Sequence, residues 1–519
     1  MKKAFGQVAV GRLSVIASVV LIASAAFPLW AASRRLVIYH TNDIHGYISA
    51  REAFFYKENP KRMIGGFAAF AGVIKKEELP KIWIDSGDFF FASPEGNLTN
   101  GESVLTLANA LGLAAMAVGN HEFDLGERRL GALAKRAQFP FLAANVMVRK
   151  YKTEGERPSY VQPYVIRDVG GVKIGIFGLI TPNTPYVTLP KNVRYLKFLR
   201  PVNVAANLVK DLRSQGAELI VAASHVGWAG DGEDFEDDKY LASHVPGIDI
   251  ILGGHTHTRL DRPYQDPANK TIIIQSGSYL TAVGRLELRL GEDGKISKFE
   301  HLLKDLWIDE TPEDPQTLRV VTPFKDMVDR KLAEVLGETK VDLTSSREGE
   351  SVLGNIIADC MREAVRADIA MQNSGGIRSS ISAGTVTLRH LYNVLPFDNT
   401  IYTMTLTGSQ VKEVLEASLS DAVIRLQTSG LIFRYDMTRP KGRRLTEVMV
   451  GKKPILVTKN YTVATNNFLA DGGDGYKTFL NGSLRKDTKT VLRDSMAQWI
   501  KKHTPLKPAL EGRMTAQRP

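Results

Sequence analysis

The chain has 519 residues, 44% of them apolar and 24% charged, which excludes a disordered or fibrous protein. Because this length exceeds that of one ordinary hydrophobic core, we expect two or three domains. The formal net charge of +11 suits an anionic substrate or surface, but no long run of Lys or Arg with interleaved aromatic residues points to a nucleic-acid polymer as partner.

The first 32 residues have the composition of an export signal. Three basic residues precede the apolar run 13–29, and small residues at 24–26 and 31–33 offer cleavage sites. An uncleaved membrane anchor is the alternative, because about seventeen apolar residues almost span a bilayer. We favour a cleaved signal peptide over residues 1–32, and therefore a periplasmic or secreted protein without a stable membrane span. The lone Cys360 can form no internal disulfide, which a large core makes unnecessary.

Apolar runs of strand length alternate with helical stretches from residue 36 onward. The runs expected to form buried strands are 36–41, 81–84, 111–118, 173–180, 219–223, 248–252 and 271–274. Helical stretches such as 101–112 and 202–215 lie between them, so we expect an α/β domain whose strands are mostly buried on both faces. An alternating strand at 286–290 closes this unit near residue 305.

A second domain follows a stretch marked by prolines. Residues 324–336 are expected to form a helix that connects the two domains. The elements expected beyond it are a helix at 354–367 and strands at 401–406, 430–435 and 461–465. The expected division of the chain is a first domain at 33–310, a linker with the connecting helix at 311–339 and a second domain at 340–519. After residue 500 we expect a loose tail.

Several of the expected strands end in side chains that can bind metal ions. The residues are Asp43, His45, Asp88, Asn120, His121, His225, His255 and His257. Because open α/β sheets collect their chemistry at the carboxyl ends of strands, these side chains are expected to lie together. Mixed carboxylate and imidazole donors suit zinc, manganese or related divalent ions. Taken alone, any of these histidines, such as His225, could be a hydrogen-bonded structural residue instead of a metal ligand. The whole set together favours a metal centre.

The stretch 119–124 also has two interpretations. It could be the start of a helix with Asn120 as its cap, or it could place Asn, His and Asp at the edge of the sheet. The other strand ends favour the second interpretation. Two acidic residues nearby, Asp85 and Glu122, are expected to be structural, Asp85 by making a turn through an Asx hydrogen bond.

In their order along the chain, these motifs resemble those of the calcineurin-like metallophosphoesterases. Within that group the chain resembles the secreted 5′-nucleotidase/UDP-sugar hydrolase family, and the likeness covers residues 35 to about 490. The motifs are Thr41-Asn42-Asp43-Ile44-His45-Gly46, Gly87-Asp88, Gly119-Asn120-His121-Glu122-Phe123-Asp124, Ser224-His225 and Gly254-His255-Thr256-His257. The resemblance implies an α/β fold in which an N-terminal metallophosphoesterase β-sandwich, flanked by helices, is joined by a helix to a smaller α+β substrate-binding domain.

The resemblance also implies two divalent metal ions, such as zinc, manganese or cobalt. Asp43, His45, Asp88 and His257 would hold one ion, and Asp88, Asn120, His225 and His255 would hold the other. Two divalent ions bring a charge of +4 and the two aspartates bring −2, which leaves about +2 to hold a phosphoryl dianion. His121 would then act beside the metals as a catalytic residue, with Asp124 fixing its tautomer from the first turn of the following helix.

Three motifs in the second domain are suited to binding a substrate. They are Gln372-Asn373-Ser374-Gly375-Gly376-Ile377-Arg378, Val394-Leu395-Pro396-Phe397-Asp398-Asn399 and Asn466-Asn467-Phe468-Leu469-Ala470-Asp471-Gly472-Gly473-Asp474-Gly475. The resemblance implies a base between Phe397 and Phe468, a ribose on Asp474, phosphate near Arg347 and Arg378, and a site lined by Asn373. Taken alone, each of these residues could have a role that involves no substrate. Phe397 could anchor the hydrophobic core, and Arg378 could be an ordinary surface charge.

The function implied is an exported dimetal phosphohydrolase that releases phosphate from nucleoside 5′-monophosphates. UDP-sugars and 2′,3′-cyclic nucleotides are possible further substrates. The alternatives are a thiosulfohydrolase of the sulfur-oxidising type and a non-catalytic nucleotide-binding protein, and the Phe397/Phe468 pair argues against the former. The metals in one domain and the base site in the other imply an active site at the domain interface, with substrate entry by domain rotation. The sequence does not predict the oligomeric state.

Overall fold

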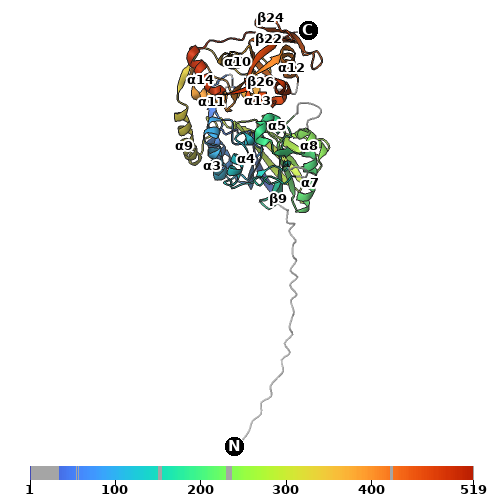
Figure 1. Ribbon diagram of the computed structural model, residues 1–519. Helices are drawn as coiled ribbons and strands as arrows, with labels where there is room; N and C mark the ends of the chain where they lie inside the picture. Colours follow the sequence, from blue (N-terminus) through green and yellow to red (C-terminus); the bar gives the residue numbers. More distant parts are fainter. Residues whose placement is uncertain are drawn as a thin grey trace.

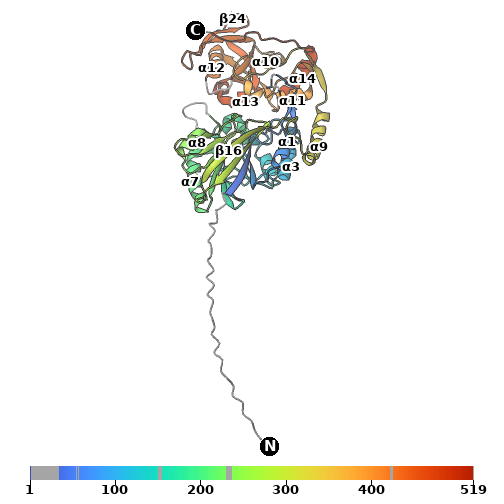
Figure 2. The ribbon, with the colours of Figure 1, turned by 180° about the vertical axis from the view of Figure 1, so that it is seen from behind.

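The computed structural model describes residues 34–53, 55–56, 58–149, 155–228, 236–420 and 425–517, together with Met1. Figure 1 shows two bodies, one built from the blue to green part of the chain and one from the orange to red part. Helix α9 (Pro315–Lys331) lies at one side and leads the chain from the first body to the second (Figures 1 and 2). The predicted export signal lies outside the described residues.

Two six-stranded sheets pack face to face in the N-terminal body. In spatial order, the first is β16 (Ile296–Asp305), β15 (Ala282–Leu290), β1 (Arg34–Thr41), β4 (Lys81–Asp85), β5 (Ala115–Ala117) and β6 (Phe141–Leu142). The second is β13 (Tyr264–Gln265), β14 (Ile272–Ile274), β12 (Ile250–Leu252), β11 (Leu219–His225), β9 (Val172–Ile180) and β8 (Tyr164–Val169). The central strands of each sheet run parallel to one another.

Strand β1 shows why these strands are continuously apolar. Leu36 and Ile38 belong to the core between the two sheets, whereas Val37 and Tyr39 belong to the core on the outer face of the first sheet. Since successive side chains of a strand point to opposite faces, a strand buried on both faces needs apolar residues at every position.

Helices cover the outer faces of both sheets. On the first sheet they are α1 (Phe67–Ile74), α3 (Glu102–Leu111) and α4 (Glu127–Ala134), and on the second they are α7 (Pro201–Ser214) and α8 (Asp238–His244). Figure 1 shows α3 and α4 on one side of the body and α7 and α8 on the other. The smaller elements are β2 (Arg51–Glu52), β3 (Met63–Ile64), α2 (Pro94–Leu98), η1 (His121–Phe123), β7 (Val146–Val148), α5 (Thr184–Val187), α6 (Pro190–Val193) and β10 (Leu196–Phe198).

The C-terminal body is a smaller α+β unit with two sheets. The five-stranded sheet has the order β21 (Leu426–Ser429), β18 (Ile369–Asn373), β25 (Asn460–Asn466), β20 (Thr400–Thr407) and β26 (Ser483–Val491). The four-stranded sheet has the order β24 (Lys453–Pro454), β23 (Leu445–Val450), β22 (Leu431–Tyr435) and β27 (Met514–Ala516). Together with the N-terminal sandwich, this architecture confirms the predicted fold class.

The C-terminal body also contains five helices, of which α10, α12 and α14 are the longest, and several short elements. The helices are α10 (Val352–Val365), α11 (Leu388–Val394), α12 (Gly408–Ser418), α13 (Asn467–Ala470) and α14 (Leu492–His503). The others are β17 (Val335–Thr339), β19 (Gly384–Thr387), η2 (Ser374–Gly376), η3 (Gly473–Gly475) and η4 (Lys477–Asn481). Within the chain that the structure describes, no helix has both the length and the apolar character needed to cross a bilayer.

The connecting helix begins nine residues earlier than we predicted from the sequence. It starts at Pro315 instead of residue 324, because the Asp314 side chain accepts a hydrogen bond from the Thr317 backbone N–H and caps the helix. Pro323, which the prediction placed before the helix, lies inside it. The predicted strand at 111–118 was also too long, since α3 continues to Leu111 and β5 covers only Ala115–Ala117.

The prediction of a loose C-terminal tail was wrong for its described part. Strand β27 pairs in parallel with β22, and Met514 lies opposite Phe433 in this pairing. Arg513, just before this strand, is buried and forms hydrogen bonds of 2.9 and 2.8 Å to the two carboxylate oxygens of Asp359 on α10. These contacts fix the tail. Its backbone groups are hydrogen-bonded to β22, and the charge of Arg513 is paired with that of Asp359.

The two bodies contact each other through α2 of the first and α11 of the second. Arg389 on α11 donates to the buried Glu95 carboxylate on α2 at 2.7 Å and also pairs with Asp329 on α9 at 2.5 Å. The Asn97 amide donates to the Pro396 carbonyl at 2.7 Å. These bonds place the segment that follows α11 beside the strand ends of the N-terminal body.

Candidate metal centre and active site

The predicted metal-binding residues follow strands whose carboxyl ends meet at one edge of the sandwich. The loops after β1, β4 and β5 of the first sheet carry four of them, and β11 and the loop after β12 of the second sheet carry the others. Left-handed backbone φ angles occur at Asp43 (50°), His45 (53°), Asp88 (54°), His255 (73°) and His257 (56°). Residues other than glycine adopt this conformation at a cost, and such strain collects at functional sites.

Three of these side chains, Asp43, His45 and His257, form one group of donors. The Nε2 atoms of His45 and His257 are 3.0 Å apart, and Oδ1 of Asp43 lies 3.3 Å from Nε2 of His257. Oδ2 of Asp88 lies 3.9 Å from Nε2 of His45. Asp43, His45 and Asp88 are buried, whereas His257 is partly exposed.

A second group of donors lies on the other side of Asp88. Nε2 of His225 is 3.1 Å from Oδ2 of Asp88 and 3.3 Å from Oδ1 of Asn120. The donor atoms of Asp88, His225 and His255 lie within 4.8 Å of one another. Asp88 therefore lies between the two groups, where it can serve both.

The hydrogen bonds of the histidines show that this arrangement fits divalent cations. Nδ1 of His45 donates to the Phe91 carbonyl at 3.0 Å, and Nδ1 of His225 donates to the Ser86 carbonyl at 2.7 Å. When neutral, as a metal ligand has to be, each ring directs the lone pair of Nε2 at the carboxylates. Oδ1 of Asp43 is buried and accepts no hydrogen bond from the described residues. Converging lone pairs without donors repel one another, and a cation between them removes that repulsion.

The charges at the site shift the pKa values of neighbouring histidines in opposite directions. Burial alone would lower the pKa of His225, but the charge and hydrogen bond of Asp88 prevail and raise it to about 10. Burial and the neighbouring His225 lower the pKa of His255 to about 4. The aspartates thus create a negative potential that attracts positive charge to this edge.

His121 lies at the same edge and is paired with Asp124. Its Nδ1 lies 2.7 Å from Oδ2 of Asp124, and its backbone N–H donates to Oδ1 of Asp88 at 2.8 Å. Burial would lower the pKa of His121, but the charges of Asp124 and Asp88 outweigh it and raise that pKa. A ring nitrogen of His121 also lies within 4.8 Å of donor atoms of His45 and Asp88.

Glu122 joins two of the metal-binding loops. Its buried carboxylate accepts hydrogen bonds from the backbone N–H groups of Gly119 at 2.7 Å, Asp88 at 2.8 Å, Phe89 at 2.8 Å and Phe90 at 3.3 Å. Burial, with the nearby charge of Asp88, raises the pKa of Glu122 to about 7. This geometry agrees with the structural role expected for Glu122.

Asp85 makes the turn that was expected of it. Its Oδ1 accepts from the Gly87 N–H at 2.8 Å, and its Oδ2 accepts from the Thr41 hydroxyl at 2.6 Å. A carboxylate held in this way shapes the loop before Asp88.

Two of the predicted substrate residues reach from the C-terminal body to this edge. Nη2 of Arg378 donates to Nε2 of His45 at 3.1 Å. The Phe397 ring lies parallel to the His121 ring, with 5.3 Å between the centroids and 10° between the planes. The site therefore contains side chains from both bodies.

The other predicted substrate residues lie farther into the C-terminal body. Asn373 donates to Oδ2 of Asp474 at 2.7 Å, and burial raises the pKa of this carboxyl group to about 6. A Cβ atom at Gly473 would lie 2.5 Å from Cζ of Phe468, so this ring lies directly against the glycine. Arg347 is exposed and close enough to Arg378 for their charges to repel.

Phe397 and Phe468 do not face each other across a gap for a base, which is the arrangement that the resemblance implied. Among the described residues, the ring that contacts Phe397 is that of His121, and Phe468 makes no ring contact with it. A base inserted between Phe397 and Phe468 would have to replace this contact with His121.

The sequence did not single out three further residues at the site. The Tyr279 ring contacts the rings of His45, His257 and Tyr47 at centroid distances of 5.5, 5.2 and 5.1 Å. The guanidinium of Arg51 lies over both tyrosines. A signal for Tyr47 and Tyr279 was present, because the first follows the Asp-x-His-Gly motif and the second follows the turn after β14.

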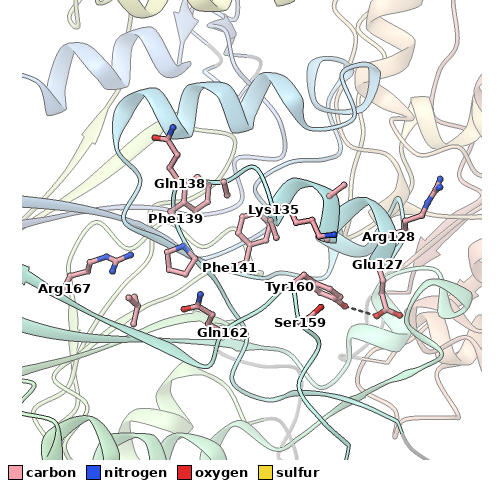
Figure 3. A pocket seen from close by; sticks show the side chains of 16 residues that line it. Glu127, Arg128, Lys135, Gln138, Phe139, Phe141, Ser159, Tyr160, Gln162 and Arg167 are labelled. Carbon is pink, nitrogen blue, oxygen red and sulfur yellow. Dashed lines mark hydrogen bonds between the residues drawn. The ribbon is translucent and has the colours of Figure 1, made fainter.

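A hollow of about 900 Å³ lies elsewhere on the N-terminal body, between α4, β6 and β8. Figure 3 shows its lining, which includes Lys135, Arg167 and a hydrogen bond of 2.9 Å between Tyr160 and Glu127. It contains none of the predicted metal-binding or substrate residues. We assign the chemistry to the convergent donors at the strand ends instead, since size alone does not define a site.

Comparison with known proteins agrees with the geometry of both bodies. The family model for the calcineurin-like phosphoesterase matches residues 36–259, and the model for the 5′-nucleotidase C-terminal domain matches residues 333–481. A 5′-nucleotidase of Bos taurus is 30% identical over 94% of this chain and 92% of its own length. The trifunctional nucleotide phosphoesterase protein YfkN of Bacillus subtilis is 32% identical over 92% of this chain, which spans only 35% of that larger protein.

Solved structures show the same relationship. A 5′-nucleotidase precursor from Thermus thermophilus has a TM-score of 0.84 and 32% sequence identity, over 93% of this chain and 99% of that chain. The sulfate thiohydrolase SoxB from Thermus thermophilus has a TM-score of 0.77 over 93% of this chain and 96% of its own, but at 19% identity it shares only the fold. The chain belongs to the 5′-nucleotidase family of metal-dependent phosphohydrolases, with a calcineurin-like phosphoesterase domain followed by a 5′-nucleotidase C-terminal domain.

Proposed function

We propose that this protein is an exported dimetal enzyme that releases phosphate from nucleoside 5′-monophosphates. The observation that carries the proposal is the contact of Arg378 and Phe397 with His45 and His121. A nucleotide has an anionic end and an aromatic end, and this site offers a guanidinium and an aromatic ring beside the metal-binding residues.

The residues proposed to hold one cation are Asp43, His45, Asp88 and His257, and those for the other are Asp88, Asn120, His225 and His255. When bound, two divalent ions such as zinc, manganese or cobalt would neutralise phosphoryl charge and make water a better nucleophile. Asp88 belongs to both proposed ligand sets. Its position between the two donor groups supports this double role.

His121 is proposed to stabilise the leaving 5′-oxygen and to give it a proton. The hydrogen bond from Nδ1 to Asp124 fixes the orientation of the ring and leaves Nε2 for the substrate. Asp124 is itself held by the Thr188 hydroxyl at 3.2 Å. The pair therefore has the geometry of a general acid with a carboxylate that supports its charged form.

The C-terminal body is proposed to bind the nucleoside. Phe397 and Phe468 would stack on the base, Asp474 would accept hydrogen bonds from the ribose hydroxyls, and Asn373 holds Asp474 in place. Arg347 and Arg378 would bind phosphate oxygens. Stacking tolerates several bases, so UDP-sugars and 2′,3′-cyclic nucleotides are included in the proposal as further substrates.

Export and the domain boundaries are also part of this proposal. A basic start, an apolar run and small residues within 1–32 support a cleaved signal peptide. The boundaries 33–310, 311–339 and 340–519 are supported by the position of α9 between the two bodies.

The test is phosphate release by the chain without residues 1–32, from AMP, UMP, UDP-glucose, 2′,3′-cyclic AMP and a thiosulfate conjugate. Hydrolysis of AMP supports the proposal, and the other nucleotides then define the substrate range. Cleavage of the thiosulfate conjugate with no action on nucleotides would show a thiosulfohydrolase. Binding of AMP without release of phosphate would show a non-catalytic nucleotide-binding protein.

A further inference from the structure

The positive charge of the chain is concentrated on the four-stranded sheet of the C-terminal body. Residues 431–459, which form β22, β23, β24 and the segment that leads to β25, contain eight basic and two acidic side chains, so their net charge is +6. The whole chain has a net charge of +11. Seven of the eight basic side chains are exposed, namely Arg434, Arg439, Lys441, Arg443, Lys452, Lys453 and Lys459. A strongly basic surface therefore lies on this sheet and its loops.

One face of this sheet is packed against the core and the other is open. Along β22, buried residues alternate with Ile432 and Arg434, which are exposed, because alternate residues of a strand point to opposite faces. Arg434 is paired with Glu447 at 3.1 Å. Ile432 lies opposite Met449 of β23, which lies opposite Pro454 of β24. The open face of such a sheet is usually polar, but here an apolar row crosses it.

A short apolar segment follows β24 and is flanked by lysines. Leu456 and Val457 are 60% and 51% exposed, with Lys452 and Lys453 before them and Lys459 after them. None of the three lysines forms an ion pair with a described residue. Exposed aliphatic side chains gain free energy when a partner removes them from water, and unpaired ammonium groups attract an anionic partner. The segment therefore fits a partner that is both apolar and anionic.

The backbone of this segment is held in place by its neighbours. The Leu456 N–H donates to the Tyr461 hydroxyl at 3.0 Å, and the Val457 carbonyl accepts from the Ser409 N–H at 2.9 Å. A Cβ atom at Gly408 would lie 2.2 Å from the Leu456 carbonyl oxygen, so the segment packs directly on the start of α12. Because the fold presents the two aliphatic side chains on a fixed backbone, a partner that binds them orders little additional chain.

The segment lies far from the proposed active site. Figures 1 and 2 show β24 at the end of the C-terminal body that points away from the N-terminal body, whereas α11 and α13 lie on the side that faces it. The proposed active site contains Phe397, which follows α11, and the metal-binding edge of the N-terminal body. A partner bound at β24 would therefore leave the entry of substrate open.

We propose that this segment docks the protein on the surface of an anionic lipid bilayer. The docking surface consists of Lys452, Lys453, Leu456, Val457 and Lys459. The ammonium groups would bind lipid phosphates, and the two aliphatic side chains would enter the boundary between headgroups and acyl chains. A nucleic-acid polymer fits less well, because its bases stack on exposed aromatic rings, whereas Phe433 and Tyr435 of this sheet are buried. Docking is independent of the proposed hydrolysis.

The lysines also have a purely structural alternative. Strand β24 is at the edge of its sheet, and lysine and proline on an edge strand prevent its pairing with another chain. Lys453 and Pro454 suit that role. Edge protection does not require Leu456 and Val457 on the surface, so variants of these two residues separate the two roles.

The test is partition of the protein between water and vesicles. Vesicles of phosphatidylcholine alone are compared with vesicles of equal parts of phosphatidylcholine and phosphatidylglycerol. The chain without residues 1–32 is used, because the apolar run 13–29 would itself enter a bilayer and the described fold begins at Arg34. We expect binding to the anionic vesicles, little binding to the neutral ones, and release at high salt.

Two variants remove the two parts of the docking surface. Each basic side chain near an anionic membrane contributes about fivefold to partition, so the triple variant Lys452→Gln, Lys453→Gln and Lys459→Gln should weaken it by about 100-fold. The double variant Leu456→Gln and Val457→Gln should weaken it by about tenfold. Both variants change exposed side chains, so thermal denaturation and AMP hydrolysis should match the wild type.

Each variant has a matched control. The triple variant Lys76→Gln, Lys135→Gln and Lys210→Gln removes the same charge from exposed lysines of the N-terminal body and should leave partition unchanged. Leu302→Gln, at a leucine of β16 that is 53% exposed, is the control for the apolar pair.

A wild type that binds neither kind of vesicle would overturn the inference, and binding of RNA in its place would show a polyanion as the partner. Equal losses in the two triple variants would also overturn it, because general charge would then explain the binding. Full binding by the double variant would exclude docking through this segment. Aggregation of the Lys452, Lys453 and Lys459 variant with no loss of vesicle binding would assign these lysines to edge protection.

Discussion

The guanidinium of Arg378 donates a hydrogen bond of 3.1 Å to Nε2 of His45, although the two residues are 333 positions apart in the sequence. This contact joins the C-terminal body to the metal-binding edge of the N-terminal body. The same His45 nitrogen faces His257 and the aspartates. A metal ion on Nε2 would take the place of the Arg378 hydrogen bond, which would free the arginine to bind the phosphate of the substrate.

Replacing Arg378 with Ala is expected to lower kcat/KM for AMP by roughly 10- to 100-fold, since one or two charge-assisted bonds to phosphate are lost. The metal content should not change. Steady-state kinetics and elemental analysis measure the two quantities. Arg434→Ala, at an exposed arginine of β22, is the control. Unchanged kinetics in Arg378→Ala would show that this arginine does not contact the substrate.

His121→Ala is expected to keep both metal ions and to lose turnover by about 10²- to 10⁴-fold, because a general acid contributes in that range. Asp124→Asn should give a smaller loss, since the imidazole remains but its orientation and charge are less well supported. Metal content and kcat are measured on the same preparations. If His121→Ala also loses a metal ion, His121 is a ligand and the proposed role is wrong.

Glu122→Ala should weaken metal binding and lower the free energy of unfolding. Four backbone N–H groups lose their acceptor, and each buried donor left unpaired costs about 1–3 kcal/mol. Thermal denaturation and metal titration measure both effects. Glu78→Ala, which removes an exposed carboxylate away from the site, is the control. Wild-type metal affinity and stability in Glu122→Ala would contradict this role.

Nucleotide binding is expected to weaken as the pH falls below about 6. Burial raises the pKa of Asp474 to about 6, so its carboxyl group is protonated below that pH and loses an acceptor for the ribose hydroxyls. KM for AMP should rise by up to about tenfold for each pH unit below 6. Asp474→Asn should have a high KM that does not follow this dependence. A wild-type KM that stays constant between pH 5 and 7 would exclude this role of Asp474.

The gathering of the candidate metal-binding residues at one edge could be predicted from sequence, because each stands in a short motif at the end of an apolar strand. Asp43, His45 and His257 needed no long-range information beyond the rule that parallel strands end at one edge of a sheet. The start of α9 was missed because Asp314 and Pro315 form a cap that was interpreted as part of a linker.

Contacts between distant elements could not be predicted in this way. The stacking of Phe397 on His121 depends on how α2 and α11 bring the two bodies together. Arg51 lies in a two-residue strand without a motif, and only the positions of Tyr47 and Tyr279 show where it lies. Such relationships follow from packing, which local periodicity does not encode.

The donors around Asp88 are proposed to hold two divalent ions on which AMP hydrolysis depends. The most direct test is to chelate the metals from the purified chain, add back zinc, manganese or cobalt stepwise, and measure bound metal and phosphate release together. We predict no release after chelation, and full release when two ions are bound per chain. Hydrolysis that persists in the metal-free protein, or full activity with no bound ion at this site, would contradict the account.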